Sequence, residues 1–357
     1  MDDFLTDSHN LSNIYAQRMH IMITGEHSYQ LRVVSKDVLF DRITFISMTH
    51  ISYKEYRSLT NGNLDDYLKT GIFYGFKTYK DTLHYIENAI VDNLCSVMRD
   101  MKYCKKVPEL YDLYLSGEIS GLILTVIMNS VYDMFSNILK RVSIEDMLRQ
   151  LRFHGFVVDE EGLIERLNNL NTQINCCRFT VDGSTEKQII QYLNEIGVFQ
   201  RGTLVVPGIA YSFAFEVLRK LMRGNDRWAL QVISDILMLD FMDALTKDII
   251  MYETQSAVGE GQALVKEQMV YNYSGEHGEF DMVIAKYRSG EAKLYKISRS
   301  GVRSDRQKQY LTNEIVLADF KKTEYPRIAG KYVLYMGETV QDGEVQYINI
   351  EEYLTNL

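Results

Sequence analysis

An aspartate followed by a Glu-x-Lys triplet gives the C-terminal part of this chain a pattern typical of metal-dependent nucleases. Asp281 is followed by nine residues and then by Glu291-Ala292-Lys293. In such enzymes the carboxylates bind a divalent cation and the lysine assists the reaction. The residues lie in GEFDMVIAKYRSGEAKLYKISRS, 278–300, which predicts a strand, a tight turn and a second strand. Whether they form a site depends on which residues pair across this hairpin.

The spacing of the hairpin argues against a metal site formed by Asp281 together with Glu291 and Lys293. Arg288-Ser289-Gly290 places the turn near residue 289, so the numbers of paired residues should sum to about 578. Asp281 then lies opposite residue 297, whereas Glu291 and Lys293 lie beside the turn. At about 3.3 Å per residue the separation is roughly 20 Å. A magnesium ion bound at about 2.1 Å by each ligand cannot bridge it.

The positions that do face Asp281 carry the wrong residues for metal chemistry. A metal site on this hairpin needs a second carboxylate and a lysine, two residues apart on the second strand, and these places fall on Lys296 and Ser298. We expect the Lys296 ammonium to take the place of the metal and to pair with Asp281 and with Glu253 of the preceding helical segment. The prediction is a vestigial nuclease-like site with no metal, formed by Glu253, Asp281, Lys296 and Ser298.

Charge is unevenly distributed along this acidic chain. The formal net charge is −9, yet 284–332 contains twelve Lys or Arg residues against five Asp or Glu residues. A basic module on an acidic body could contact phosphates, although a solvated lysine-rich surface explains the same composition. The candidate nucleic-acid contacts are Arg299, Arg303, Arg306 and Lys308.

Hydrophobic patterns predict an α/β part, a helical part and an α+β part. Two short apolar runs, 19–24 and 42–49, flank a helix-like segment and indicate part of a parallel sheet. Apolar residues at helical spacing follow from about 64 to 151, and period-two alternation with tight turns marks the last hundred residues. We expect domains at 1–58, 59–151, 152–244 and 245–357.

A winged helix-turn-helix is predicted in the third of these domains. Ser184 can cap a helix, Gly197 can end it, and a short strand follows. The exposed residues of that helix are nearly neutral in sum, which favours packing against protein over reading DNA.

Other sequence features exclude several classes of protein. The longest apolar run, 121–135, is interrupted by Asn129 and is shorter than the roughly 20 residues of a membrane span, so it predicts a buried helix. The N-terminus is acidic and lacks an apolar signal region, which favours the cytoplasm and no membrane. The four cysteines have neither zinc-ligand nor disulfide-framework spacing.

The order of the motifs resembles that of a bacterial and archaeal family of AAA-type ATPases. The matching segments are MHIMITGEHSYQL, LFDRITFISMTHISYKEY, LDDYLKTGIFYG, KDIIMYET, GEFDMVI, LYKIS, RQKQYLTNE, IAGKYVLYMGE and VQYINIEEYL. The resemblance implies an ATP-binding α/β core, helices with a winged helix, and a C-terminal PD-(D/E)XK module with a restriction-endonuclease-like fold. It implies that Thr24 is the sensor residue, that Arg42 is the family's arginine, and that LYKIS occupies the frame of the family's metal-binding Glu and catalytic Lys.

The chain departs from this family at the nucleotide site. No Gly-x-x-x-x-Gly-Lys-Ser/Thr loop occurs, and 18 residues precede the sensor strand. Without the amides and lysine of that loop the ATP phosphates are not held, so Thr24 and Arg42 have structural roles. We expect no cofactor for this chain alone. ATP and Mg²⁺ would require a phosphate loop from a partner chain or from a missing N-terminal part.

Three functions are compatible with this sequence. The first is a non-catalytic interaction or regulatory protein derived from such an ATPase, a pseudoenzyme with a degenerate nuclease-like module. The second is one half of a split ATPase, and the third is a metal-dependent nuclease. The first predicts a protein partner or a second copy that covers residues 1–58, with nucleic acid bound, if at all, through 284–332.

Overall fold

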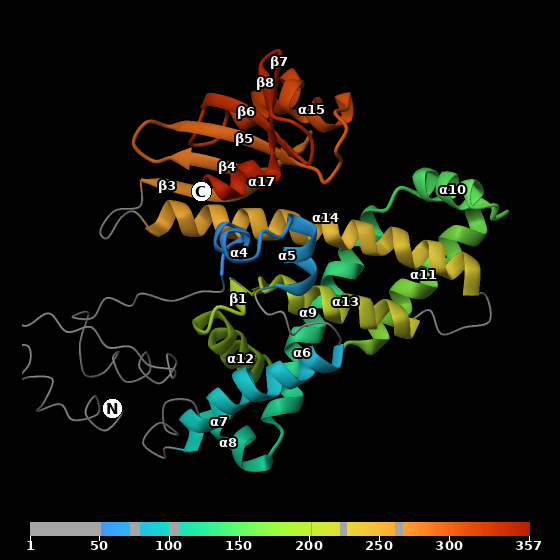
Figure 1. The fold of residues 1–357 in the computed structure, drawn as a ribbon, viewed down its shortest axis with the longest axis vertical. Helices are drawn as coiled ribbons and strands as arrows, with labels where there is room; N and C mark the ends of the chain where they lie inside the picture. Colours follow the sequence, from blue (N-terminus) through green and yellow to red (C-terminus); the bar gives the residue numbers. More distant parts are fainter. Residues whose placement is uncertain (1–50, 72–78, 100–107, 201, 222–226, 261–266) are drawn as a thin grey trace, which may run out of the picture. The chain divides into compact units, whose positions relative to one another are not determined.

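The computed structural model describes residues 51–71, 79–99, 108–200, 202–221, 227–260 and 267–357 (Figure 1). They form a mixed structure of helices and strands with a six-stranded mixed sheet, which agrees with the expected classes at this coarse level. Thr24, Arg42 and nearly all of the part expected to derive from an ATPase core lie outside the described residues.

Contacts divide the chain into two compact units. The helical unit contains the described residues of 74–230, and the sheet unit contains those of 51–73 and 231–357. The expected boundaries at 58, 151 and 244 fall instead inside helices α4 (Tyr53–Thr60), α10 (Ile144–Phe153) and α14 (Arg227–Glu260). In α14 the buried face continues across the expected boundary, from Phe241 and Met242 to Leu245 and Ile249, so the pattern shows no break at 244.

The helical unit is organised around α9 (Ile119–Arg141). This helix packs against α8, α11, α12, α13 and the π-helix η1, and its core-facing residues include Ile123, Ile127 and Phe135. The other elements of the unit are α6 (Tyr79–Tyr85), η1 (Ile86–Val91), α7 (Asp92–Arg99), α8 (Pro108–Ser116), α10, α11 (Glu160–Cys177), α12 (Gly183–Glu195), β1 (Phe199–Gln200), β2 (Thr203–Leu204) and α13 (Pro207–Leu221).

The polar residue that interrupts the apolar run of α9 has a structural task. Asn129 is 8% exposed, its amide nitrogen donates to the Phe179 carbonyl at 3.0 Å, and its amide oxygen accepts from the Phe179 N–H at 3.4 Å. Among the described helices, α9 is the one whose length and composition would suit a membrane span, a test that a core helix also passes. The apolar run 121–135 therefore lies in a core helix, as predicted, because α9 has a buried face and is bonded to the segment that follows α11.

The segment predicted as a winged helix contains the expected helix, glycine stop and strand return. Gly197 has φ +74°, and the β1–β2 hairpin follows it. The predicted cap at Ser184 is wrong: the cap lies two residues earlier, at Asp182, which accepts from the Ser184 and Thr185 amides at 3.1 and 3.3 Å, and α12 begins at Gly183. A carboxylate accepts these bonds and also complements the positive end of the helix dipole.

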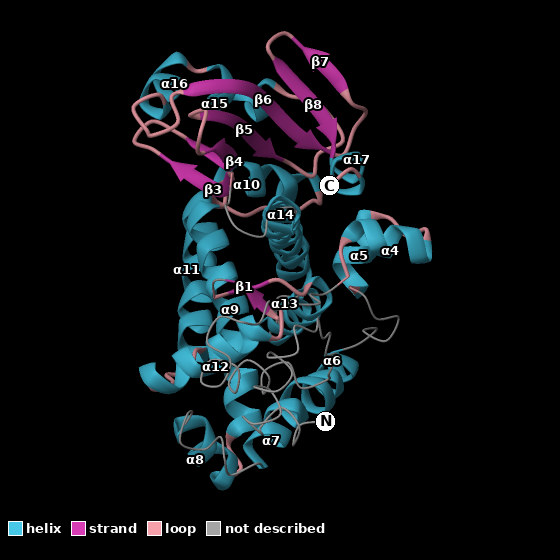
Figure 2. Cartoon of the chain, turned by 90° about the vertical axis from the view of Figure 1, so that its left-hand side faces the viewer, coloured by secondary structure: helices cyan, strands magenta, loops and turns pink. Residues whose placement is uncertain are grey.

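The sheet unit is built on strands in the order β3-β4-β5-β6-β8-β7 (Figure 2). β3, β4 and β5 are antiparallel neighbours, β6 and β8 run parallel to β5, and β7 returns antiparallel beside β8. The strands are β3 (Gln268–Ser274), β4 (Glu279–Lys286), β5 (Glu291–Ile297), β6 (Arg327–Tyr335), β7 (Val340–Asp342) and β8 (Val345–Asn349).

Helices cover both faces of this sheet. α15 (Asp305–Thr312) and α16 (Glu314–Phe320) connect β5 to β6 and contribute Leu311, Val316 and Phe320 to a core with the sheet. α14 runs along the opposite face, where the Gln255 side chain donates to the Val270 carbonyl of β3 at 3.1 Å. α17 (Ile350–Thr355) ends the chain and contacts α4, β6 and β8.

Two short helices from far earlier in the sequence complete the sheet unit. α4 and α5 (Leu64–Thr70), drawn in blue in Figure 1, form with their flanking residues a segment, 51–71, that we call the strap. Tyr53, Tyr56 and Tyr67 of the strap form a buried ring cluster with centroid separations of 5.6 and 5.2 Å. Residues 51–58, expected to belong to an ATPase remnant, are thus part of the sheet unit, where they contact α14 and α17.

The role of Asn129 can be tested by replacing it with leucine. Asn129→Leu removes both bonds to Phe179, so we expect the free energy of unfolding to fall by about 1 kcal/mol, because the Phe179 groups are only partly shielded from water. A membrane-facing position would tolerate leucine without loss. Denaturant unfolding of the purified protein measures the change, and Thr125→Ala, which removes a hydroxyl bond within the same helix, is the matched control.

Candidate functional site

The β4–β5 hairpin pairs one residue away from the predicted register. Lys286 pairs with Glu291 and Met282 with Tyr295, so paired residue numbers sum to 577 and Asp281 falls opposite Lys296 rather than residue 297. The turn occupies 287–290, with Gly290 at φ +64°. Glu291 remains beside the turn, about 17 Å along the strand from the level of Asp281. Asp281, Glu291 and Lys293, which match the nuclease pattern in sequence, therefore do not form a site in this structure.

The carboxylate of Asp281 is surrounded by three donors. The Lys247 Nζ of α14 lies 3.0 Å from Oδ1, while the Lys296 Nζ lies 3.2 Å from Oδ2 and the Ile297 N–H donates to Oδ2 at 2.8 Å. The side chains of Asp281 and Lys296 are 8% and 14% exposed. The predicted ion pair between Asp281 and Lys296 is therefore confirmed. Glu279 adds a longer contact to the same ammonium at 3.5 Å.

Glu253 does not join this pair, and that part of the prediction is wrong. Its Oε1 accepts from the Tyr53 N–H at 2.8 Å and from the Tyr67 hydroxyl at 3.0 Å, both in the strap. Lys247 approaches Asp281 instead. The reason is helical geometry, since six residues rotate a side chain to a position about 120° away and about 9 Å further along the axis.

Ser298 belongs to the loop after β5. Its N–H donates to the Leu334 carbonyl at 2.9 Å, which extends the pairing with β6. Its hydroxyl accepts from the Ser300 N–H at 3.3 Å and from the Gln307 amide at 3.4 Å. The Ser298 hydroxyl therefore stabilises the loop, and serine lacks the basic nitrogen of the catalytic lysine that the nuclease pattern has at this position.

Charged residues continue from Asp281 to the strap, linked by ion pairs and by a backbone hydrogen bond to Asp243. Lys247 lies four residues beyond Asp243 on α14, and the Arg299 N–H donates to the Asp243 carboxylate. Burial raises the pKa of Asp243, and the cations of Arg299 and Lys247 oppose that rise. The Arg299 guanidinium in turn binds Asp65 of α5 at 2.5 Å. We call this series, from Glu279 to Asp65, the ion-pair network; its members are Glu279, Lys296, Asp281, Lys247, Asp243, Arg299 and Asp65.

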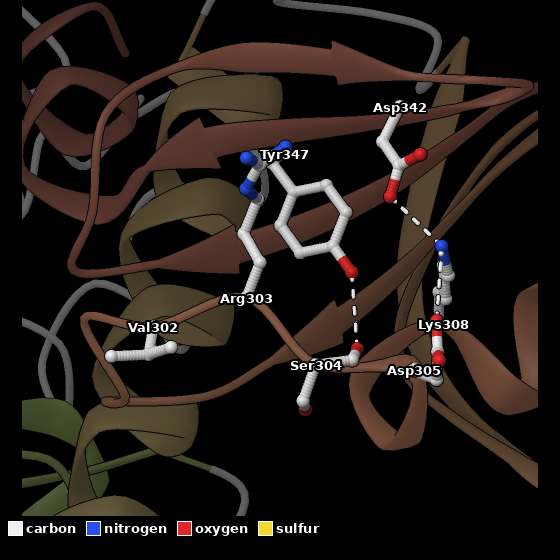
Figure 3. A pocket seen from close by; sticks show the side chains of 7 residues that line it. All are labelled: Val302, Arg303, Ser304, Asp305, Lys308, Asp342 and Tyr347. Carbon is white, nitrogen blue, oxygen red and sulfur yellow. Dashed lines mark hydrogen bonds and ion pairs between the residues drawn. The ribbon is translucent and has the colours of Figure 1, made fainter.

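Two of the four candidate nucleic-acid contacts, Arg299 and Lys308, bind protein carboxylates, whereas Arg303 and Arg306 are exposed. Arg299 is held as described, and Lys308 lies between Asp305 at 3.2 Å and Asp342 at 2.8 Å. Figure 3 shows this arrangement in a surface pocket lined by Val302, Arg303, Ser304, Asp305, Lys308, Asp342 and Tyr347. Arg303 is exposed and makes no ion pair with the described residues. The local charge is thus largely balanced, which does not favour a phosphate-binding surface.

The network leaves little room for divalent metal chemistry. Both Asp281 oxygens are already occupied by donors, two of which carry a full positive charge. An ammonium and a divalent ion about 4 Å apart repel by about 8 kcal/mol at an effective dielectric constant of about 20. The arrangement can hold three elements together, but it does not provide an open coordination site.

Sequence reasoning missed Lys247, Asp243 and Asp65 as members of this site. Asp243 and Lys247 have i,i+4 spacing on a helix, which is a usable signal for a shared face. Asp65 lies 234 residues from Arg299 and carries no such signal.

Removing the lysine that replaces the metal tests the structural role of the network. In Lys296→Met, Asp281 keeps its contacts with Lys247 and with the Ile297 N–H but loses a partly buried cation. We therefore expect the free energy of unfolding to fall by about 2 kcal/mol. Lys293→Met is the matched control, because Lys293 is exposed on the same strand and should change stability by no more than about 0.5 kcal/mol. Equal effects in denaturant titrations would contradict the assigned role of Lys296.

Comparison with known proteins adds no relative. The chain matches no protein-family model, and neither the curated proteins nor the solved structures give a match. The site must therefore be interpreted from its own geometry.

Proposed function

We propose that this chain is a non-catalytic interaction or regulatory protein in which a nuclease-like sheet unit has exchanged metal chemistry for internal ion pairing. The observation that carries the proposal is the position of two ammonium groups, Lys247 and Lys296, at 3.0 and 3.2 Å from the two oxygens of Asp281. They supply the positive charge that a bound cation would otherwise contribute. The derivation of the whole chain from an AAA-type ATPase belongs to the same proposal and rests on the resemblance in sequence.

The order of elements in the sheet unit supports this interpretation. A long helix precedes an antiparallel hairpin, the hairpin carries an acidic residue on its first strand, and the facing position of the second strand carries the residue that would complete a metal site. That residue is Lys296, where the resemblance implies a carboxylate. A lysine of opposite charge at this point preserves the contact with Asp281 while removing a ligand.

The use of the sheet unit as a binding surface supports an interaction role. The strap contributes carboxylates, amides and tyrosine rings to the sheet unit, although more than 150 residues of sequence separate it from α14. Glu253, a member of the expected vestigial site, and Arg299, which follows Ser298, bind this segment. The module thus behaves as a platform that holds another piece of polypeptide.

The proposal predicts that the wild-type protein does not cleave nucleic acid. Single- and double-stranded DNA and RNA are incubated with the protein in Mg²⁺ or Mn²⁺, beside Asp281→Asn. Cleavage by the wild type that disappears in Asp281→Asn would overturn the proposal. Cleavage that persists unchanged in Asp281→Asn does not arise from the Asp281 site.

Metal binding can be restored by design if the interpretation is correct. In the double variant Lys247→Met, Lys296→Glu both ammonium groups are gone and a second carboxylate faces Asp281. We expect it to bind Mn²⁺ with a dissociation constant of about 1 mM or tighter, measured by electron paramagnetic resonance, while the wild type shows no saturable binding. Lys293→Glu, which adds a carboxylate near the turn, serves as the control. Equal Mn²⁺ binding by the wild type and the double variant would contradict the assignment.

A further inference from the structure

The strap is attached to the sheet unit by carboxylates that cap its helices. α4 and α5 each begin with a backbone N–H that has no partner within the helix. Glu253 of α14 accepts the one from Tyr53 at 2.8 Å, and Glu351 of α17 accepts the one from Leu64 at 2.8 Å. Arg299 and Asp65 form the third attachment. Helices of eight and seven residues are too short to persist alone in water, so these contacts and the tyrosine cluster decide whether the strap folds.

The three attachments differ in charge balance. Asp65 binds the Arg299 guanidinium, and Glu351 lies 3.6 Å from the Arg57 guanidinium and is partly exposed. Glu253 is 5% exposed, and in the part of the chain that the structure describes it accepts only neutral donors, the Tyr53 amide and the Tyr67 hydroxyl. An ionised carboxylate in such a place lacks both water and a counter-ion, which makes its charge costly.

We propose that the strap is a pH-sensitive latch, docked on the sheet unit while Glu253 is neutral and released when Glu253 ionises. This inference goes beyond the proposed function, since it does not depend on whether the sheet unit has lost nuclease chemistry. Release would also separate Arg299 from Asp65 and expose the tyrosine cluster, so the surface presented by the module would change with pH.

The groups around Glu253 determine the direction of the effect. Burial raises the pKa of Glu253 from 4.5 to about 7, the bonds from Tyr53 and Tyr67 lower it in part, and the negative charge of Glu55 raises it further. The titratable groups that act on Glu253 are Glu55 on α4 and Tyr67 on α5. Arg57 on α4 and Glu351 on α17 act on Tyr53, and Tyr353 on α17 is bonded to Thr254, the residue after Glu253.

A raised carboxyl pKa means that the docked state prefers the neutral acid. Docking is therefore strongest below pH 4.5, weakens as the pH rises toward 7, and levels off above that value, where Glu253 is ionised in both states. With these pKa values the opening equilibrium increases about tenfold between pH 6 and pH 8. Asp240 and Asp248 of the same helix also have pKa values raised to about 6 by burial, so a comparison must cancel their contribution.

Hydrogen exchange of the full chain, followed by mass spectrometry, tests the latch. The variant Glu253→Gln keeps an oxygen that accepts both bonds but cannot ionise. For peptides within 53–70, the ratio of the wild-type exchange rate to that of Glu253→Gln cancels the intrinsic pH dependence of exchange and the effects of Asp240 and Asp248. We expect this ratio to rise about tenfold from pH 6 to pH 8. A ratio that stays constant within twofold would overturn the proposal.

A matched control and an internal reference guard against misfolded variants. Glu351→Gln neutralises the other capping carboxylate, and its strap should keep the pH dependence of the wild type. A loss of that dependence in Glu351→Gln would contradict the role given to Glu253. The wild type alone offers a second measurement, because strap peptides should gain exchange relative to α9 peptides as the pH rises. Equal slopes for strap and α9 in the wild type would also overturn the latch.

Discussion

The carboxylate of Asp281 adds charged contacts that join α14 to the hydrogen-bonded strands β4 and β5. It accepts from Lys247 of α14, from Lys296 of β5 and from the backbone at the end of β5, while its own backbone belongs to β4. A carboxylate that is 8% exposed cannot remain charged without such partners. The register of the hairpin, the rotation of α14 about its axis and the position of the β5 end are therefore coupled. A change in any of them would leave a buried charge unpaired.

The same requirement spreads outward from Asp281 to the strap. Asp243 accepts a hydrogen bond from the backbone N–H of Arg299, and the Arg299 guanidinium forms an ion pair with Asp65. Each carboxylate of the network therefore contacts a donor from a different element. Replacement of buried ion pairs by apolar residues is often neutral or stabilising, which means that the network need not add stability. Its stronger effect is on specificity, because few alternative packings of α14, the hairpin and the strap satisfy all of these charges together.

Local patterns in the sequence predicted the pieces of this site better than their assembly. The turn at 287–290 was located closely enough to place Lys296 against Asp281, although the register differs by one residue. The glycine stop at Gly197 and the buried helix containing Asn129 also follow from local chemistry. The strap could not be predicted, because contacts such as Asp65 with Arg299 join residues 234 positions apart and leave no period in the sequence. Glu253 was misplaced because the face of a long helix cannot be assigned until its neighbours are known.

Two carboxylates on α14 and β4 thus meet opposite electrostatic environments within one unit. Asp281 lies between two ammonium groups, Lys247 at 3.0 Å and Lys296 at 3.2 Å. Glu253 lies among neutral donors and a nearby like charge, so burial favours its neutral form. Ionisation of Glu253 therefore acts on the attachment of the strap and, through it, on the contact between Arg299 and Asp65.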